Sequence, residues 1–530
     1  MKVLMVNPEF PFSFWSYPEA CKFLGAKALV APLGLITVAA LLPKDWELRL
    51  CDLNTAKINE ADWDWADMVM VSAMFVQRDG ILALIKEAKE RAKNVVVGGP
   101  HPTTMPDEVI DAGCDFLIVG EAEQSISPFL SALKQGELNG IFRSTQRPDM
   151  SASPVPRFDL LKFEDYGCIA IQTSRGCPYN CEFCEIINLY GRKPRYKTPN
   201  QVIKELEAIY RLGWRGMVFF CDDNFIGNKD HAKSILQKLI PWMKGHGEPF
   251  SFNTQASLNL GQDLEMIDLM TEANFREVFI GVETPDKEIL DLIHKNQNIG
   301  SPLIESLNNI NRNGLSVMGS FIIGFDGEKG GAGDRICTFV DRTNIHVVML
   351  NILQAVPNTR LWDRLKAEGR LREEMMRCLG VEVYQNFIPL RPAGEIIDEY
   401  VQVLSYLYEP SRYLARCYNS ALSMRPTRAA LAAQRGDPPP AACSPRNKLP
   451  WKRQFWGFLG FLRLIWRQGI RASYRRQFWS QLINIKRKNP SRLGKYLFFC
   501  SEGEDMFHFR KIVLKWAHDT RKSRDTNHII

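Results

Sequence analysis

The pattern of hydrophobic and polar positions divides the first 145 residues into alternating strands and helices. Short apolar runs of strand length occur at residues 3–6, 47–51, 68–72, 95–98 and 116–119. Residues 33–42 and 80–92 instead carry apolar side chains three or four positions apart, which is the spacing of one helix face. This alternation predicts a parallel, doubly wound α/β sheet, and ligands of such sheets bind at the carboxyl ends of the strands.

A second series of strand and helix patterns runs from residue 155 to residue 365. Six strands are predicted, at residues 169–173, 216–221, 251–254, 276–282, 317–324 and 346–353. The clearest helical patterns lie at residues 201–212, 264–273 and 287–292. Six β/α units in succession predict a barrel-like sheet whose chemistry lies at the carboxyl ends of its strands.

Length and composition limit how many domains the chain can have and which cellular compartment is expected. A chain of 530 residues is too long for one hydrophobic core, so we expect domains at residues 1–145, 155–365 and 366–530. Thirteen cysteines, an odd number without the density of a disulfide scaffold, predict reduced thiols in the cytoplasm. We find no signal-peptide pattern and no run of about eighteen uncharged apolar residues, so neither secretion nor a membrane-spanning helix is expected.

Three cysteines stand close together just after the first strand of the second series. Cys177, Cys181 and Cys184 have C-x3-C-x2-C spacing, so one loop can bring three thiolates to a single inorganic centre. A structural zinc site needs four ligands, and no second pair of Cys or His residues stands nearby. A [4Fe–4S] cluster on three thiolates keeps one iron open for a substrate or cofactor. The alternative is that three cysteines share this loop by chance.

This stretch resembles the signature of the radical S-adenosylmethionine (SAM) enzymes, including the aromatic Phe183 before the last cysteine. The resemblance implies a partial (β/α)6 barrel, a [4Fe–4S] cluster on the three cysteines, and SAM bound at the open iron. Residues at the ends of the predicted strands match positions that contact SAM in the family: Asp222, Asp223, Asn224, Glu283 and Gly324. Each of them could instead cap a strand end or hold a loop.

The amino-terminal domain resembles the Rossmann-like (flavodoxin-like) cobalamin-binding domain of the B12-dependent radical SAM subfamily. The resemblance rests on residues 32–35, 72–74, 98–101 and 120–123. Candidate cobalamin contacts lie at the strand ends: Ser72, Gln77, Gly98, Gly99, Gly120 and Glu121. The Asp-x-His-x-x-Gly motif of many cobalamin domains is absent and no histidine precedes His101, so a lower axial histidine is not expected. The alternative is a degenerate sheet that binds nothing.

The last part of the chain changes composition. Residues 425–450 are rich in Ala, Pro and Arg and predict a flexible linker. Residues 451–500, the basic aromatic segment, hold twelve Lys or Arg and no Asp or Glu, interleaved with Trp and Phe. Such an amphipathic helix is typical of the membrane interface. Two alternatives stay open: a helical domain that packs its aromatic side chains on the barrel, and a single-stranded nucleic-acid site, which no recognition motif supports.

The order of cobalamin domain, barrel and mainly helical extension resembles the class B radical SAM methyltransferases. Residues 408–410 and 474–482 resemble the hopanoid C-2 methylases in particular. In that family SAM supplies a methyl group to cobalamin and a radical that removes hydrogen from an unactivated carbon. The resemblance implies methylation of C-2 of a small-molecule lipid, a hopanoid such as diploptene or diplopterol. It also implies a reducing partner of the flavodoxin or ferredoxin type, and a cytoplasmic protein lying peripherally on the inner face of the membrane.

Two other classes of function stay open. A B12-dependent radical SAM enzyme could act on another lipid, a natural product or a tetrapyrrole, either as a methylase or as a ring-closing cyclase. A cobalamin or Fe–S sensing protein would bind the cofactors and leave SAM intact. No nucleic-acid partner is expected, and the sequence assigns no residue that acts on the substrate itself.

Overall fold

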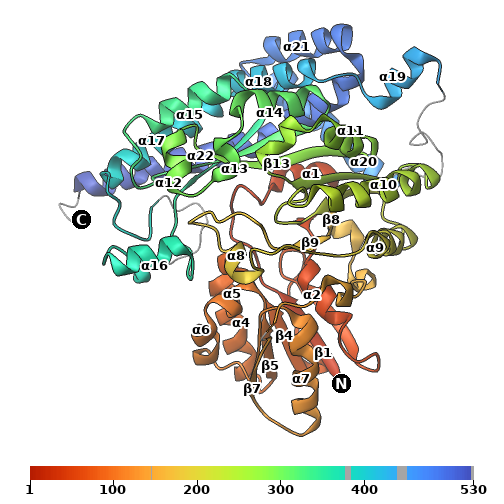
Figure 1. The fold of residues 1–530 in the computed structure, drawn as a ribbon, viewed down its shortest axis with the longest axis vertical. Coiled ribbons are helices and arrows are strands. Elements are labelled where there is room, and N and C mark those ends of the chain that lie inside the picture. The colour runs from red at the N-terminus through yellow and green to blue at the C-terminus, as the bar shows by residue number, and fades with distance from the viewer. Residues whose placement is uncertain (145, 376–383, 438–450, 527–530) are drawn as a thin grey trace.

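The computed structural model describes residues 1–144, 146–375, 384–437 and 451–526, which form two lobes (Figure 1). The lower lobe in Figure 1 is built on a six-stranded parallel sheet with strand order β3-β1-β4-β5-β6-β7. Its strands are β1 (Lys2–Asn7), β3 (Glu47–Asp52), β4 (Met68–Ser72), β5 (Asn94–Gly98), β6 (Phe116–Val119) and β7 (Gly140–Arg143). The doubly wound α/β sheet is confirmed, and β7 is an edge strand that the sequence analysis did not predict.

Helices cover both faces of this sheet, because successive residues of a strand point to opposite sides. Val3 and Met5 of β1 pack into the core on one face, and Leu4 and Val6 pack into the core on the other. The covering helices are α2 (Leu33–Ala39) and α7 (Ala122–Lys134) on the first face, and α3 (Glu60–Trp65), α4 (Arg78–Glu90) and α6 (Pro106–Asp111) on the second.

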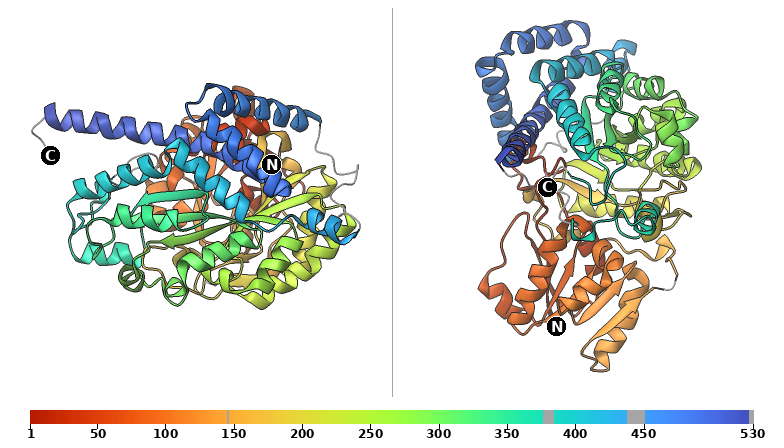
Figure 2. Two further views of the ribbon diagram at one scale, coloured as in Figure 1. Left: turned by 90° about the horizontal axis from the view of Figure 1, so that it is seen from above. Right: turned by 90° about the vertical axis from the view of Figure 1, so that its left-hand side faces the viewer.

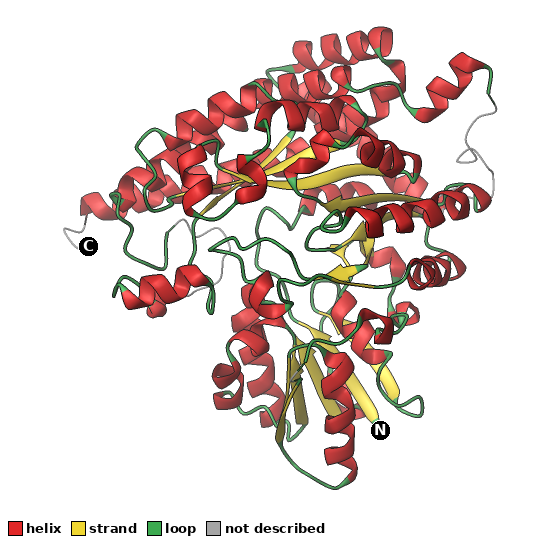
Figure 3. Ribbon diagram, in the orientation of Figure 1, coloured by secondary structure: helices red, strands yellow, loops and turns green. Residues whose placement is uncertain are grey.

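The upper lobe contains a seven-stranded parallel sheet, curled into a half-barrel, with strand order β15-β14-β13-β12-β11-β8-β2 (Figure 3). Six of its strands are those predicted from the sequence: β8 (Tyr166–Ile171), β11 (Gly216–Phe220), β12 (Phe250–Gln255), β13 (Phe275–Glu283), β14 (Ser316–Ile323) and β15 (Val347–Ile352). The partial (β/α)6 barrel is therefore confirmed.

The seventh strand of the upper sheet comes from the amino-terminal part of the chain. β2 (Ala28–Val30) pairs with β8 in parallel, with Ala28 opposite Tyr166 and Val30 opposite Cys168. The chain thus crosses from the lower lobe into the upper lobe and returns before it completes the lower sheet. Sequence patterns did not indicate this crossing, because a strand of three residues is too short to show a period.

Helices follow the barrel strands in the order expected for β/α units. They are α8 (Ile186–Leu189), α9 (Pro199–Arg211), α10 (Lys229–Gly245), α11 (Leu264–Glu272), α12 (Lys287–Leu292), α13 (Asn296–Ile299), α14 (Leu303–Arg312), α15 (Ala332–Asp341) and α16 (Arg360–Ala367). The start of α9 shows why such a helix begins where it does. Thr198 and Gln201 exchange side-chain to backbone hydrogen bonds in a capping box, and Pro199 occupies the first helical position.

The carboxyl-terminal part is helical, as predicted. Its helices are α17 (Ala393–Leu407), α18 (Pro410–Ser423), α19 (Arg428–Arg435), α20 (Trp451–Leu464), α21 (Arg475–Lys488) and α22 (Leu493–Thr526). Figure 2 shows α22 crossing the body of the molecule and extending beyond it. The prediction of a linker over residues 425–450 was wrong for α19, whose Ala-rich sequence favours a helix capped by the Thr427 side chain. Residues 438–450 lie outside the described residues.

The basic aromatic segment is not one helix. α20 continues into a π-helical turn, Ile465–Arg471, and the chain then reverses into α21. Part of the segment packs inward: Gly25 after α1 (Pro18–Leu24) lies against Trp456, and Phe478 is fully buried. Trp451 and Phe458 nevertheless remain 72% and 59% exposed. Among the residues described, no helix combines the length and the apolar character needed to span a bilayer.

Candidate active site

One loop of the upper lobe carries the three cysteines, and two glycines close it. We call residues 176–191 the cluster loop; it follows β9 (Ser174–Arg175), which pairs with β10 (Arg195–Tyr196). The Cys177 N–H donates to the Gly191 carbonyl at 3.2 Å. Gly176 has φ +95°, and a Cβ there would lie 2.8 Å from the same carbonyl oxygen, so only glycine fits where the loop ends meet.

The thiols of the cluster loop form no disulfide and lie partly or wholly inside the protein. Burial raises the pKa of Cys184 to about 12 and also raises the pKa of Cys177. The nearby Lys295 ammonium opposes both shifts. A buried thiol becomes a thiolate only beside a cation or a metal, since burial penalises the charged form. Three neighbouring free thiols in these surroundings fit an Fe–S cluster, which binds them deprotonated.

Glu283 and Lys295 form an ion pair beside the cluster loop, with 2.6 Å between Glu283 Oε1 and Lys295 Nζ. Glu283 ends β13 after a bulge and has φ +65°, a strained conformation that is concentrated at functional sites. Gly281 makes room for it, because a Cβ there would lie 2.2 Å from Glu283 Oε1. Lys295 Nζ also lies 6.0 Å from the centre of the Phe183 ring. The structure thus brings the predicted residues Phe183 and Glu283 to one place.

Sequence analysis missed two polar residues at the cluster loop, Lys295 and Gln297. The Gln297 amide donates to Cys181 Sγ at 3.7 Å. Both residues belong to a run of five polar residues, 294–298, between α12 and the end of α13. This run carries no strand or amphipathic pattern, and that is the signal that could have indicated a functional segment.

Asp222 and Asn224, at the carboxyl end of β11, hold the backbone of the site. Asp222 is fully buried, and its carboxylate accepts hydrogen bonds from the N–H and hydroxyl groups of Thr173 and from the Ser174 N–H. Asn224 exchanges hydrogen bonds with Ser257 after β12. These side chains join neighbouring strand ends, and the buried Asp222 carboxylate presents no free surface to a ligand.

Asp223, between those two residues, points to the cluster loop. Its Oδ2 accepts the N–H of Gly176, the first residue of the loop, at 2.8 Å. Burial raises the pKa of Asp223 to about 7, and the Gly176 hydrogen bond opposes this rise. Asp223 therefore positions the cluster loop and carries a carboxyl group with a pKa near neutrality.

Gly324 makes a tight turn at the end of β14. It has φ +94°, and a Cβ there would lie 3.0 Å from Gln385 Nε2. Its N–H donates to Glu328 Oε2 at 2.8 Å, and its carbonyl accepts from Gln385 at 3.0 Å. The next residue, Phe325, places its ring centre 6.0 Å from that of Phe183. The turn therefore packs beside the cluster loop.

In the lower lobe, Ser72, Gly98 and Gly99 meet at the carboxyl ends of β4 and β5. Ser72 stands opposite Gly98 in the sheet. Gly99 has φ +102°, and a Cβ there would lie 2.6 Å from Ser72 Oγ. On the next strand, Gly120 has open space on its Cβ side. An edge lined by glycines, with room beside it, fits the close approach of a large planar group such as cobalamin.

Two of the predicted cobalamin contacts have other tasks. Gln77 is buried and donates to the Pro8 carbonyl at 2.5 Å, so it ties the loop after β1 to the segment after β4. Glu121 is buried in ion pairs with two arginines of the upper lobe, at 2.7 Å from Arg175 and 2.6 Å from Arg195. Gln77 and Glu121 do lie at strand ends, as predicted from the sequence, but in the structure each of them joins two segments of the protein.

The carboxyl edge of the lower sheet faces the cluster loop (Figure 1). Helix α5 (Pro100–Thr104), which follows Gly99, packs against α8 of the cluster loop. The Asn358 side chain, just before α16, donates to the Thr104 carbonyl at 2.9 Å. The glycine-lined edge and the three cysteines therefore lie on opposite sides of one interface.

Three family models match successive parts of the chain. They are a B12 binding domain at residues 24–129, the radical SAM superfamily at residues 171–338, and a domain of unknown function, DUF4070, at residues 359–518. The first covers β2 to β6, the second covers β9 to β14, and the third covers α16 to α21 and most of α22.

Two relatives match nearly the whole chain. An uncharacterized methyltransferase of Synechocystis sp. is 45% identical over 513 residues, covering 97% of this chain and 92% of the relative. The hopanoid C-2 methylase of Rhodopseudomonas palustris is 34% identical over 483 residues, covering 90% and 88%.

Two solved structures share the fold at low sequence identity. OxsB, a cobalamin-dependent S-adenosylmethionine radical enzyme, has a TM-score of 0.57 at 15% identity and covers 100% of this chain and 81% of its own. TsrM from Kitasatospora setae, a radical S-adenosylmethionine methyltransferase, has a TM-score of 0.55 at 16% identity and covers 97% and 99%. The chain therefore belongs to the cobalamin-dependent radical SAM methyltransferases. Its cofactors are a [4Fe–4S] cluster, SAM and cobalamin.

Proposed function

We propose that this methyltransferase adds a methyl group to C-2 of a hopanoid such as diploptene or diplopterol. The observation that carries the proposal is its 34% identity to a hopanoid C-2 methylase over 90% of this chain. Because 88% of that enzyme is covered, no large part of it lacks a counterpart here.

The proposal gives the residues of the interface distinct tasks. Cys177, Cys181 and Cys184 hold the cluster. Contacts to SAM come from the residues gathered around it, which are Phe183, Asp223, Glu283 and the Gly324 turn. Cobalamin lies along the edge lined by Ser72, Gly98, Gly99 and Gly120. When bound, SAM and cobalamin supply the radical and the methyl group, and the protein orients both and excludes water. A flavodoxin or ferredoxin type of protein supplies the electron.

The surface of α20 and the π-helical turn supports a membrane-dissolved substrate. Phe455, Phe458 and Trp466 are 52%, 59% and 53% exposed, and Trp451 is 72% exposed. Large exposed apolar side chains among cations are typical of surfaces that insert into the membrane interface. We propose that this surface contacts the bilayer from which the hopanoid enters.

The proposal can be tested in a hopanoid-producing bacterium that lacks its own C-2 methylase. The chain is expressed there at low oxygen with cobalamin and methyl-deuterated methionine, and the lipids are analysed by gas chromatography–mass spectrometry. We expect a new hopanoid with the deuterated methyl group on its A ring. The Cys181→Ala variant, expressed to the same level, should give none.

Unchanged hopanoids, with SAM still cleaved by the purified protein, would remove the hopanoid substrate. A label found on another lipid or a tetrapyrrole would identify a different methylation. A new product without label would indicate a cyclase, and intact SAM under strong reductant would indicate a sensing protein.

A further inference from the structure

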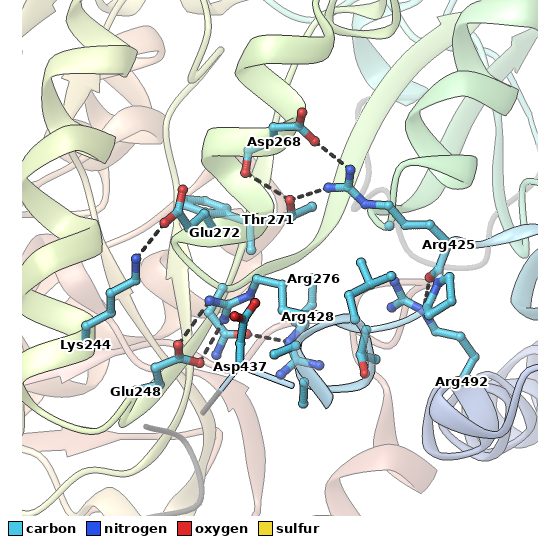
Figure 4. Close-up of a pocket in the computed structure, with 18 of the residues that line it drawn as sticks. Lys244, Glu248, Asp268, Thr271, Glu272, Arg276, Arg425, Arg428, Asp437 and Arg492 are labelled. Atoms are coloured by element: carbon cyan, nitrogen blue, oxygen red, sulfur yellow. Dashed lines mark hydrogen bonds and ion pairs between the residues drawn. The ribbon is translucent and has the colours of Figure 1, made fainter. Parts of the chain in front are cut away.

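A cavity of about 890 Å³ lies far from the cluster loop, where the barrel meets the carboxyl-terminal helices (Figure 4). Its walls come from the end of α10, from α11, from the first residues of β13, from α19 and from Arg492 before α22. Along β13, Glu283 at the cluster loop lies seven positions after Arg276 in the cavity. At 3.3 Å per residue this corresponds to about 23 Å, so the cavity is separate from the site described above.

The cavity walls carry more positive than negative side chains. The cations are Lys244, Arg276, Arg425, Arg428, Arg435 and Arg492, and the carboxylates are Glu248, Asp268, Glu272 and Asp437. Six cations against four carboxylates leave an excess of two positive charges.

Three of the cations are neutralised by ion pairs, which Figure 4 shows. Arg428 binds both carboxylate oxygens of Glu248, at 3.0 and 2.8 Å. Arg425 lies 2.6 Å from Asp268, and Lys244 lies 2.6 Å from Glu272. These pairs hold the cavity walls in place and use three of the four carboxylates.

Arg276 and Arg492 have no carboxylate partner among the described residues. Arg276 Nε donates to Asn274 Oδ1 at 2.8 Å, and Arg492 Nε donates to the Arg425 carbonyl at 2.8 Å. Both residues line the cavity, and their terminal Nη groups have no hydrogen-bond acceptor in the described structure. Arg492 is only 7% exposed, whereas Arg276 is accessible through the cavity.

The Arg492 guanidinium group is in unfavourable surroundings. Burial, followed by the nearby cations Arg276 and Arg425, lowers the pKa of Arg492 to about 10. Buried cations are normally paired, so the buried and unpaired Arg492, with the accessible Arg276 on the wall of the same cavity, indicates a missing anion.

We propose that this cavity binds a phosphate group between Arg276 and Arg492. Guanidinium groups recognise phosphate through paired, charge-assisted hydrogen bonds, and two of them match the charge of a dianion. The group belongs either to a soluble phosphorylated compound or to a phospholipid head group. The bound anion joins the first residues of β13 to the carboxyl-terminal helices and stabilises the folded protein by mass action.

The test uses the full-length protein with its cofactors and inorganic pyrophosphate as the probe. Binding is measured by isothermal titration calorimetry, and the unfolding temperature is followed at increasing pyrophosphate concentration. Arg276→Gln should weaken binding at least tenfold and remove the rise in unfolding temperature. Arg276 is exposed and forms no ion pair among the described residues, so its replacement removes one protein hydrogen bond, the one to Asn274 Oδ1. Lys244→Gln, which removes a paired cation of the same cavity, is the control and should bind nearly as wild type.

A water-soluble short-chain phosphatidic acid, used as a second probe, separates the two sources. Equal dependence of both probes on Arg276 supports recognition of the phosphate group alone. Binding of the lipid only, lost in Arg276→Gln, supports a phospholipid head group. The proposal is overturned if neither probe binds at millimolar concentration, or if Arg276→Gln binds like the wild-type protein.

Discussion

Arg175 Nη1 lies 2.7 Å from Glu121 Oε2. Glu121 belongs to the cobalamin-binding lobe and Arg175 directly precedes the cluster loop, so this ion pair connects the lobe to the loop. Arg175 also binds Glu123 at 2.8 Å, and Glu121 binds Arg195 at 2.6 Å. All four side chains are largely buried. Because Gly176 follows Arg175 directly, the ion pairs fix the position of the cluster loop relative to the edge proposed for cobalamin.

The first prediction concerns this connection. Arg175→Met should lower the urea midpoint of unfolding and methyl transfer together, because it leaves the buried Glu123 carboxylate without its ion-pair partner and leaves Glu121 paired with Arg195 alone. Breaking a buried ion pair typically costs about 3–5 kcal/mol. Arg157→Gln is a matched control, since Arg157 and Asp159 form an exposed pair worth about 0–1 kcal/mol. A midpoint for Arg175→Met equal to that of Arg157→Gln would contradict the role of the pair.

The second prediction concerns Lys295. Its ammonium lies beside the cluster thiols and binds Glu283, so Lys295→Gln removes the nearby positive charge and leaves Glu283 buried without a partner. We expect less iron per chain after anaerobic reconstitution. We also expect the affinity for SAM to fall by about tenfold or more. Lys287→Gln, an exposed lysine of α12, is the control. Normal iron content and normal SAM affinity in Lys295→Gln would show that Lys295 is not part of the site.

The third prediction tests the edge proposed for cobalamin. Gly99→Ala should reduce cobalamin binding, measured from the visible absorption of the purified protein, because the new Cβ would lie 2.6 Å from Ser72 Oγ and 3.0 Å from the Ala73 backbone. Gly113→Ala is the control: Gly113 has nearly the same φ, +99° against +102°, and its nearest neighbour would be 3.6 Å away. Equal cobalamin binding by the two variants would place the cofactor elsewhere.

The fourth prediction is a pH dependence of stability at the other end of the barrel. His346 lies 3.3 Å from Glu277 of β13 and 3.2 Å from Glu502 of α22, and Lys495 of α22 lies 3.4 Å from Glu277. Despite burial, the two neighbouring carboxylates raise the pKa of His346 above its ordinary value of 6.5. Its stabilising effect is therefore complete below pH 6.5 and is lost as the pH rises through the raised value.

Neighbouring groups affect the same measurement in known directions. Burial raises the pKa of Glu502, which acts in the same direction as His346, and burial lowers the pKa of Lys495, which acts in the opposite direction. Comparing wild type with His346→Gln between pH 6 and pH 9 separates the histidine from both. The unfolding temperature of wild type should exceed that of the variant most at the acid end. A difference that does not change with pH would mean that His346 is neutral throughout.

The sequence predicted the fold well because its signals are local. All six predicted barrel strands and the five predicted strands of the lower sheet exist, and each was identified from its own apolar run. The crossing of β2 was not predictable, because its pairing with β8 depends on residues more than a hundred positions away. α19 was mistaken for a linker because the proline run that follows it dominates the composition of the segment.

The candidate site was only partly predictable, and the reason is physical. A polar residue at a strand end can face a ligand or join two protein segments, and the sequence pattern is the same. Glu121 was predicted to contact cobalamin, and in the structure its carboxylate binds Arg175 and Arg195, neither of which is near it in sequence. Glycines were more informative: Gly99 and Gly324 adopt positive φ and have close neighbours at their Cβ positions.

The central claim is that the three cysteines hold a cluster that drives methylation of a hopanoid. The most direct measurement is anaerobic turnover of the reconstituted protein with cobalamin, a strong reductant, diploptene and SAM carrying a deuterated methyl group, analysed by mass spectrometry. We predict formation of 5′-deoxyadenosine together with diploptene that carries the deuterated methyl group at C-2, and neither product with Cys181→Ala. 5′-Deoxyadenosine from Cys181→Ala at the wild-type rate would contradict the cluster assignment, and 5′-deoxyadenosine without labelled diploptene would contradict the substrate.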